Sequence, residues 1–371
     1  MVYYCKKCDN LGLIELLVAV VSIAVLLPVL AWGDPIASRT SGGPKTLIWN
    51  YTDLEELRVN AKVWYDVKGI DGFIFCYVNG GGPPRWYSGP DKVAEIYRDL
   101  PRTVAALRAA GVDANFVHAG VDYPDWNWFD DALMAKIVPT FRALARIAKT
   151  SGCRGVAIDT EPYGDCRDKL WDPRGYPAHK HIELVQRIRS IGADVARVIL
   201  EEFPEAEILV LPEGAYISAC NTPGVQWYDL WMEFFNGLAS RRPPNGIVVL
   251  CECGYHWTDP ISITTLYGMV QGLMLGESDD LVYFRTKCSV ALGAAVDFVT
   301  TSPQEFAQQW RTMRQLSPRY AWIFGAESNF WQIPDGREAD RPSMTKPLPP
   351  NADKYFNVLR EVRESSGGSG K

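Results

Sequence analysis

The chain has 371 residues, of which 47% are hydrophobic, 12% aromatic and 22% charged, and its formal net charge is −6. A disordered chain would contain fewer apolar and aromatic residues, and a nucleic-acid-binding protein usually carries an excess of basic residues. The composition therefore excludes both classes. The 13 Trp, 17 Tyr and 14 Phe require either a large core or a site lined by aromatic side chains.

One long apolar segment lies near the N-terminus. Leu11–Trp32 has 22 residues, and Glu15 is the single charged residue within it. About 20 apolar residues span a bilayer core, and Lys6 and Lys7 before the segment favour a cytoplasmic N-terminus. We expect a single transmembrane helix that anchors the chain in the membrane and places its remainder on the extracytoplasmic side. A cleaved secretory signal is the alternative.

The sequence LGLIELLV at residues 11–18 resembles the N-terminal motif of type IV pilins, in which a glutamate is the fifth residue of the mature helix. The resemblance places Leu11 first and Glu15 fifth, with Asn10 where the family has glycine. It implies a prepilin-type helix, a pilus or secretion machinery as partner, and a secreted or surface location after processing of the leader. A pilin-like structural surface protein is therefore one alternative function.

The composition divides the chain into four parts. A leader and transmembrane segment at 1–32 is followed by a linker at 33–45, GDPIASRTSGGPK, and the chain closes with a flexible tail at 364–371, ESSGGSGK. The part between them, 46–363, is predicted to be one catalytic domain, because α/β barrels of this length fold as single domains.

Apolar runs that are typical of strands alternate with helical patterns along 46–363. Continuous rather than alternating apolar residues indicate strands buried on both faces of a parallel sheet. Seven such runs are Thr46–Tyr51, Gly72–Val78, Asn115–His118, Gly155–Asp159, Glu207–Leu211, Gly246–Cys251 and Tyr320–Phe324. The segment Ser289–Val296 is compatible with an eighth strand or with a helix.

The segments between the strands have helical periodicity. Apolar residues recur at intervals of three and four in 130–149 and 181–200, and Asp91, Asp130 and Ser302 are expected to cap helices. Repeated strand–helix units predict an α/β fold, a (β/α)8 TIM-type barrel. An open doubly wound sheet is the alternative, although no G-x-G-x-x-G motif follows the first strand.

Acidic and aromatic residues gather just after the predicted strands, where a barrel builds its active site. Sugars present flat apolar faces edged with hydroxyl groups, so this composition points to a carbohydrate substrate. The residues expected to bind substrate are Trp49, Asn79, His118, Trp126, Tyr163, Tyr255, His256, Trp257, Glu327 and Trp331. Trp86 and Trp128 also follow strand ends, and the aromatic excess is therefore predicted to serve sugar stacking.

Asp159 and Glu161 are the strongest catalytic candidates. Their i, i+2 spacing places both side chains on one face of a strand, and mutual repulsion raises one pKa so that an acid operates near neutral pH. The sequence GVAIDTE resembles the fourth-strand motif of chitinase-like glycoside hydrolases, although Arg154 and Ala157 stand where that motif has aspartates. The following Glu161-Pro162 is similar to the Asn-Glu-Pro motif of retaining glycosidases, with Thr160 in place of asparagine. The resemblance implies that Glu161 is the acid.

Glycoside hydrolysis requires a second carboxyl group, whose distance from the acid decides between retention and inversion of configuration. Glu252, Glu213 and Glu327 are the candidates. The sequence thus predicts a glycoside hydrolase acting on an extracellular poly- or oligosaccharide. A non-catalytic carbohydrate-binding barrel is the alternative.

No metal or cofactor is expected from the sequence. His179 and His181 form an H-x-H pair, but they open a helix rather than follow a strand. Cys5 and Cys8 lack a second pair of zinc ligands. The nine cysteines cannot all be paired, and one or two disulfides involving Cys153, Cys166 or Cys220 stay open.

Overall fold

The computed structural model describes residues 43–78, 83–121, 123, 125–162, 169–220, 228–255, 257–295, 301–324 and 352–367. The predicted transmembrane and pilin-like segment Leu11–Trp32 lies outside these ranges. Within them, no helix is both long enough and apolar enough to cross a bilayer.

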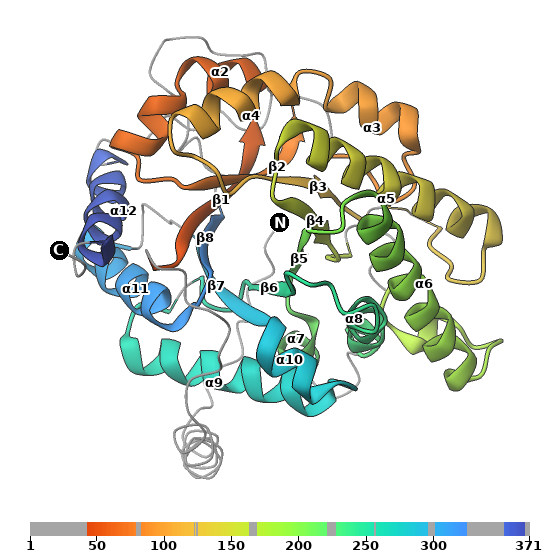
Figure 1. Ribbon diagram of the computed structural model, residues 1–371. Coiled ribbons are helices and arrows are strands. Elements are labelled where there is room, and N and C mark those ends of the chain that lie inside the picture. The colour runs from red at the N-terminus through yellow and green to blue at the C-terminus, as the bar shows by residue number, and fades with distance from the viewer. Residues whose placement is uncertain are drawn as a thin grey trace.

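Eight parallel strands form a closed barrel in chain order (Figure 1). Leu47 pairs with Gly72 on one side and with Trp322 on the other, so the first strand joins the second and the last. The segment Ser289–Val296, whose pattern is compatible with a strand or a helix, contains the seventh strand. The predicted (β/α)8 barrel is confirmed by β1 (Lys45–Thr52), β2 (Gly72–Val78), β3 (Phe116–Ala119), β4 (Gly155–Asp159), β5 (Glu207–Leu211), β6 (Ile247–Cys251), β7 (Ser289–Ala295) and β8 (Tyr320–Phe324).

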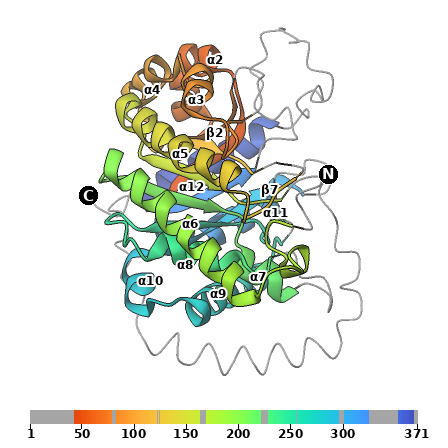
Figure 2. The same ribbon diagram turned by 90° about the vertical axis from the view of Figure 1, so that its right-hand side faces the viewer.

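Helices surround the barrel on its outside (Figures 1 and 2). The described α-helices are α2 (Leu54–Val59), α3 (Pro90–Ile96), α4 (Leu100–Ala109), α5 (Asp131–Ser151), α6 (His181–Glu202), α7 (Gly214–Cys220), α8 (Trp231–Ala239), α9 (Pro260–Glu277), α10 (Leu281–Lys287), α11 (Pro303–Leu316) and α12 (Ala352–Gly367). A short π-helix, η1 (Val63–Val67), and a 3₁₀ helix, η3 (Pro173–Gly175), are also present. Helix α12 continues four residues past the predicted boundary at 363.

Two of the three predicted helix caps are confirmed. The Asp130 side chain accepts hydrogen bonds from the first turn of α5, and Ser302 forms a capping box with Glu305 at α11. Asp91 is not a cap, because Gly89 occupies the N-cap position of α3 and Asp91 lies within its first turn. An acidic residue there is still favourable near the helix N-terminus.

Buried side chains fill two layers, one inside the barrel and one between the barrel and its helices. Ala157 and Leu250 belong to the inner layer. Since strand side chains alternate between the two faces, the inward direction recurs two residues later, at Asp159 and Glu252. The fold therefore directs both carboxyl groups toward the interior at the carboxyl ends of β4 and β6.

The opposite end of the barrel is closed by an ionic network around Glu207. Its carboxylate pairs with Arg154 at 3.3 Å and with Arg319 at 2.7 Å, and it accepts a hydrogen bond from the Tyr320 hydroxyl at 2.5 Å. These contacts join β4, β5 and β8 at the starts of the strands. The network stabilises the barrel away from the predicted site.

Candidate active site

The four predicted catalytic carboxyl groups lie close enough to interact. Desolvation raises the pKa of Glu252 well above its ordinary value, and the charges of Glu161, Glu213 and Asp159 raise it further. Desolvation also raises the pKa of Tyr228, and the charges of the same four acids add to this effect. The structure therefore brings together, at the carboxyl ends of β4, β5 and β6, acids that the sequence separates by almost a hundred residues.

The end of β4 is held by hydrogen bonds around Thr160. Asp159 Oδ1 accepts a hydrogen bond from the Glu161 backbone N–H at 2.9 Å. The Asp159 carboxyl group therefore fixes the backbone of residues 159–161, which we call the β4 turn. Thr160 donates from its N–H and its hydroxyl to the Leu211 carbonyl at the end of β5, at 2.6 and 2.7 Å. The two catalytic candidates are thus attached to the neighbouring strand.

Three indole groups donate hydrogen bonds to the same turn. Trp86 Nε1 donates to the Asp159 carbonyl at 3.1 Å. Trp171 Nε1 donates to the Thr160 carbonyl at 2.8 Å, and Trp231 Nε1 donates to Thr160 Oγ1 at 2.8 Å. We call Trp86, Trp171 and Trp231 the indole clamp. Since all three rings are fully buried, their donors have no access to water and hold the turn firmly.

Several tryptophans that follow strand ends are buried in the layer between the barrel and its helices. Trp126 is 1% exposed and packs edge-on against Trp86 and Trp128. All three rings lie between the barrel and its helices, so none of them presents a face to a substrate. Trp126 therefore lies on the side of the barrel wall that faces the helices, and many of the aromatic side chains support the core and the β4 turn.

A second aromatic group lines the inside of the barrel near the carboxyl groups. The Trp49 ring centre lies 5.8 Å from that of His118 and 5.3 Å from that of Phe324. Tyr255 lies 5.6 Å from Trp322 and stacks on Phe324 at 5.7 Å. These contacts place three of the predicted substrate-binding residues, Trp49, His118 and Tyr255, on one wall.

This wall carries polar atoms without protein partners. Among the described residues, neither ring nitrogen of His118 nor Nε1 of Trp49 has a hydrogen-bond partner, and all three atoms are buried. His118 Nε2 lies 3.5 Å from Asp159 Oδ2. Unpaired buried polar atoms are costly, and here they lie beside a carboxylate, where the hydroxyl groups of a ligand would satisfy them.

Other predicted substrate-binding residues differ in their placement. Trp257 is 39% exposed, and its backbone carbonyl accepts a hydrogen bond from Gln309, which also binds the carbonyls of Gly254 and Tyr255. Gln309 therefore fixes the loop after β6. Asn79, Tyr163, His256, Glu327 and Trp331 lie outside the described residues.

The sequence analysis missed two residues near the carboxyl groups. An added Cβ at Gly120 would lie 3.4 Å from Asp159 Oδ2 and 3.5 Å from Arg85 Nη1, so Arg85 and Asp159 both lie next to Gly120. Tyr228 is the other. Arg85 follows a glycine-rich run after β2 and Tyr228 precedes α8, and neither position carries a motif that would have identified it.

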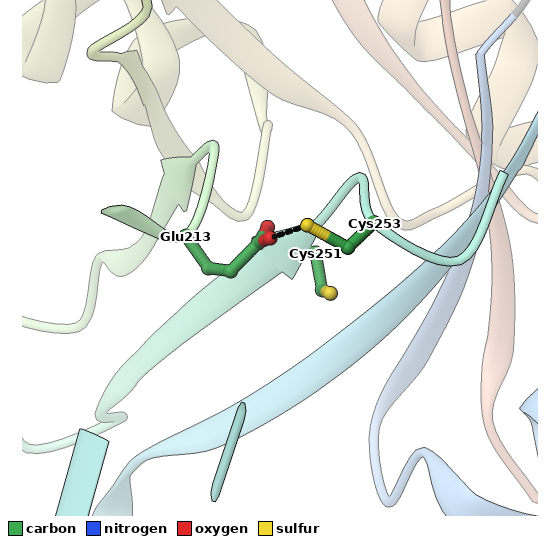
Figure 3. Close-up of side chains that lie close together, drawn as sticks. All are labelled: Glu213, Cys251 and Cys253. Atoms are coloured by element: carbon green, nitrogen blue, oxygen red, sulfur yellow. Dashed lines mark hydrogen bonds between the residues drawn. The ribbon is translucent and has the colours of Figure 1, made fainter. Parts of the chain in front are cut away.

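Glu213 is completely buried behind Glu252. Its Oε1 accepts a hydrogen bond from the Cys253 thiol at 2.7 Å (Figure 3). Its Oε2 accepts one from the Glu252 backbone N–H at 2.9 Å. Desolvation raises the pKa of Glu213 to about 7, although these hydrogen bonds oppose the shift. Glu213 therefore positions the Glu252 backbone, and the side chain of Glu252 is the more accessible of the two.

None of the cysteine side chains that the structure describes, which do not include those of Cys166 and Cys220, forms a disulfide. Cys76, Cys153, Cys251, Cys253 and Cys288 are all free. The sequence left a bridge at Cys153 open, and the structure shows that this thiol is free and buried. Cys166 lies outside the described residues.

No protein-family model and no curated protein matches this chain. Solved structures with a similar backbone include a glucosidase from Croceicoccus marinus, with a TM-score of 0.51 and 12% identity over 90% of this chain and 69% of that chain. They also include a GH18 chitinase from Pseudoalteromonas aurantia, with a TM-score of 0.48 and 12% identity over 86% and 99% of the two chains. A 3-keto-D-glucoside 4-epimerase from E. coli has a TM-score of 0.46 and 12% identity over the same shares. At this identity the likeness shows the fold alone, a (β/α)8 barrel.

Proposed function

We propose that this chain is a glycoside hydrolase that cleaves a poly- or oligosaccharide with Glu161 and Glu252. The observation that carries the proposal is the meeting of four carboxyl groups at the carboxyl ends of β4, β5 and β6. Such an arrangement is where parallel barrels place their chemistry.

Glycoside hydrolysis uses one carboxyl group as the acid for the leaving oxygen and a second as nucleophile or base. Glu161 and Glu252 follow different strands, so their side chains approach the interior from different sides. Asp159 and Glu213 act as positioning residues, because each accepts a backbone N–H, from Glu161 and from Glu252 respectively.

The surroundings of the pair fit a sugar. Trp49, His118 and Tyr255 form an apolar wall, and three of its polar atoms form no hydrogen bond within the described part of the chain. Apolar ring faces contact the C–H faces of a sugar, and the unpaired nitrogens of His118 and Trp49 meet its hydroxyl groups. Trp257 has an accessible ring for a more distant sugar unit.

The test is a comparison of Glu161→Gln, Glu252→Gln and a control, Glu205→Gln. Glu205 is exposed and lies before β5, at the end of the barrel opposite the site. The wild-type chain is first screened on aryl glycosides of glucose, mannose, xylose and N-acetylglucosamine and on the matching polysaccharides. Turnover is then measured for each variant, together with circular dichroism to verify the fold.

Both site variants are expected to lose at least ~10³-fold of polysaccharide turnover, while Glu205→Gln keeps it. The variant that lacks the acid retains activity on dinitrophenyl glycosides, whose leaving group needs no proton, and the other variant loses both activities. Normal turnover in either site variant would overturn the assignment. Glycan binding without any cleavage by the wild-type chain would instead identify a carbohydrate-binding barrel.

We further propose that Leu11–Trp32 anchors the chain with the barrel on the extracytoplasmic side. The apolar length of the segment supports this. Val20→Lys places a charge near its centre at a cost of about 3 kcal/mol, so alkaline extraction should release this variant and retain the wild type in the membrane fraction. Release of both proteins would contradict the anchor.

A further inference from the structure

Glu213, Cys251 and Cys253 form a compact group beside the proposed active site (Figure 3). One carboxylate oxygen and the two sulfur atoms all lie within 4.8 Å of one another. Cys251 is the last residue of β6, and Glu213 and Cys253 each lie two residues past the ends of β5 and β6, which pair through Leu209 and Val248. No other group of three such residues with this spacing occurs among the described residues.

Glu213 has no positive partner within the described part of the chain. Its side chain is completely buried, and its partners there are thiols and backbone N–H groups rather than lysine, arginine or histidine. A buried carboxylate is ordinarily paired with a cation or coordinates a metal ion. Here the nearby groups are two thiols, which become metal ligands when they lose their protons.

We propose that Glu213, Cys251 and Cys253 bind one zinc ion. Two sulfur ligands and one carboxylate favour Zn²⁺ over Mg²⁺ or Ca²⁺, which prefer oxygen ligands alone. Ligand atoms that are each ~2.3 Å from a tetrahedral zinc ion lie about 3.8 Å apart. The observed upper limit of 4.8 Å therefore requires only small side-chain rotations.

The binding step is balanced by proton release. Zn²⁺ replaces the thiol proton of Cys251 and that of Cys253, and both protons pass to the solvent. Cys253 is partly exposed, whereas Cys251 is completely buried, so the ion enters from the Cys253 side. Three protein ligands leave the fourth tetrahedral position to water.

The zinc ion would connect the carboxyl ends of β5 and β6. Glu213 already accepts the N–H of Glu252, so a metal held by Glu213 fixes the residue between the two cysteines. The ion would support the position of Glu252 without taking part in hydrolysis itself, and its test does not depend on any glycosidase activity.

The test uses the full chain after treatment with a chelator. Zinc is titrated in competition with a chromophoric chelator, and Co²⁺ is used as a spectroscopic probe. We expect one zinc ion per chain and, with Co²⁺, thiolate-to-metal charge-transfer absorption. A chain that binds no zinc, or that binds Co²⁺ without this absorption, would overturn the proposal.

Variants connect the binding to these residues. Loss of a group that only hydrogen-bonds a metal ligand costs about 10- to 100-fold in affinity. Cys253→Ser and Glu213→Gln should therefore each weaken zinc binding more than ~100-fold. Cys288→Ser is the matched control, because Cys288 is a buried free thiol outside the cluster, and it should bind zinc as the wild type does.

Unchanged affinity in either ligand variant would exclude this site. Circular dichroism verifies that each variant is folded. Glu213→Gln preserves the shape of the side chain, so it still tests the site in the case that Cys253→Ser disturbs the loop. Since zinc affinity is the readout, loss of hydrolysis in Glu252→Gln neither supports nor weakens the metal site.

Discussion

Replacing Trp171 with phenylalanine tests the indole clamp most directly. The substitution keeps an aromatic ring but removes the N–H that donates to the Thr160 carbonyl at 2.8 Å. Thr160 is completely buried, so water cannot replace the lost donor. Leaving a buried carbonyl unpaired costs about 1–3 kcal/mol.

Trp310→Phe provides the matched control. Trp310 is also completely buried, but its Nε1 has no hydrogen-bond partner among the described residues. Both substitutions remove the same atoms, so the loss of ring volume is common to the two variants. The difference between them isolates the hydrogen bond, and Trp171→Phe should be less stable than Trp310→Phe by about 1–3 kcal/mol.

Chemical denaturation measures this difference in the free energy of unfolding from the denaturant concentration at the midpoint of the transition. An unchanged slope of free energy against denaturant concentration shows that both variants unfold in the same way. Turnover provides a second readout, because Thr160 lies between Asp159 and Glu161. A misplacement of about 1 Å costs up to ~100-fold in rate, so Trp171→Phe should be slower than Trp310→Phe. Equal midpoints and equal rates in the two variants would refute the clamp.

The remaining predictions concern the barrel and the inner wall. Glu207→Gln removes the partner of Arg319 and should destabilise the fold by about 3 kcal/mol in urea unfolding, with hydrolysis unchanged; a loss of activity in the folded variant would contradict the separation of the two barrel ends. Gly155→Ala places a Cβ 1.8 Å from a backbone oxygen of Glu207 and should cost about 3 kcal/mol or more. Gly276→Ala, with no atom within 4 Å of the added Cβ, should instead gain about 0.5–1 kcal/mol; equal midpoints would reject this reasoning. His118→Phe removes two buried nitrogens that form no hydrogen bond among the described residues, so the fold should lose little stability while KM rises ~10-fold, and an unchanged KM would exclude His118 from substrate binding.

The barrel could be predicted from the sequence because its signals are local. Each strand is a short apolar run, and the i, i+2 spacing of Asp159 and Glu161 follows from the pleat of β4. The ambiguity at Ser289–Val296 arose because small residues such as alanine and glycine fit both a helix and a tightly packed strand. Hydrogen bonding to β6 and β8 decides in favour of the strand.

The roles of the tryptophans could not be predicted, because they depend on contacts between distant segments. Trp126 and Trp257 both follow strand ends, yet one is buried between the barrel and its helices while the other is accessible. Local sequence does not distinguish these environments. The group of Glu213, Cys251 and Cys253 could not be predicted for the same reason, since the two cysteines gain Glu213 as a third ligand only when β5 lies beside β6.

Strand β5 connects the two halves of the proposed catalytic pair. Thr160 donates to the Leu211 carbonyl on the β4 side, and two residues further along Glu213 accepts the N–H of Glu252 on the β6 side. The separation of Glu161 and Glu252 is therefore set through short hydrogen bonds to one intervening segment rather than by the flexible ends of two loops. A glycosidase needs this separation to be constant, because it decides where water or the nucleophile meets the sugar. The indole clamp on one side of β5 and the thiol cluster on the other serve the same requirement, the fixed placement of two carboxyl groups.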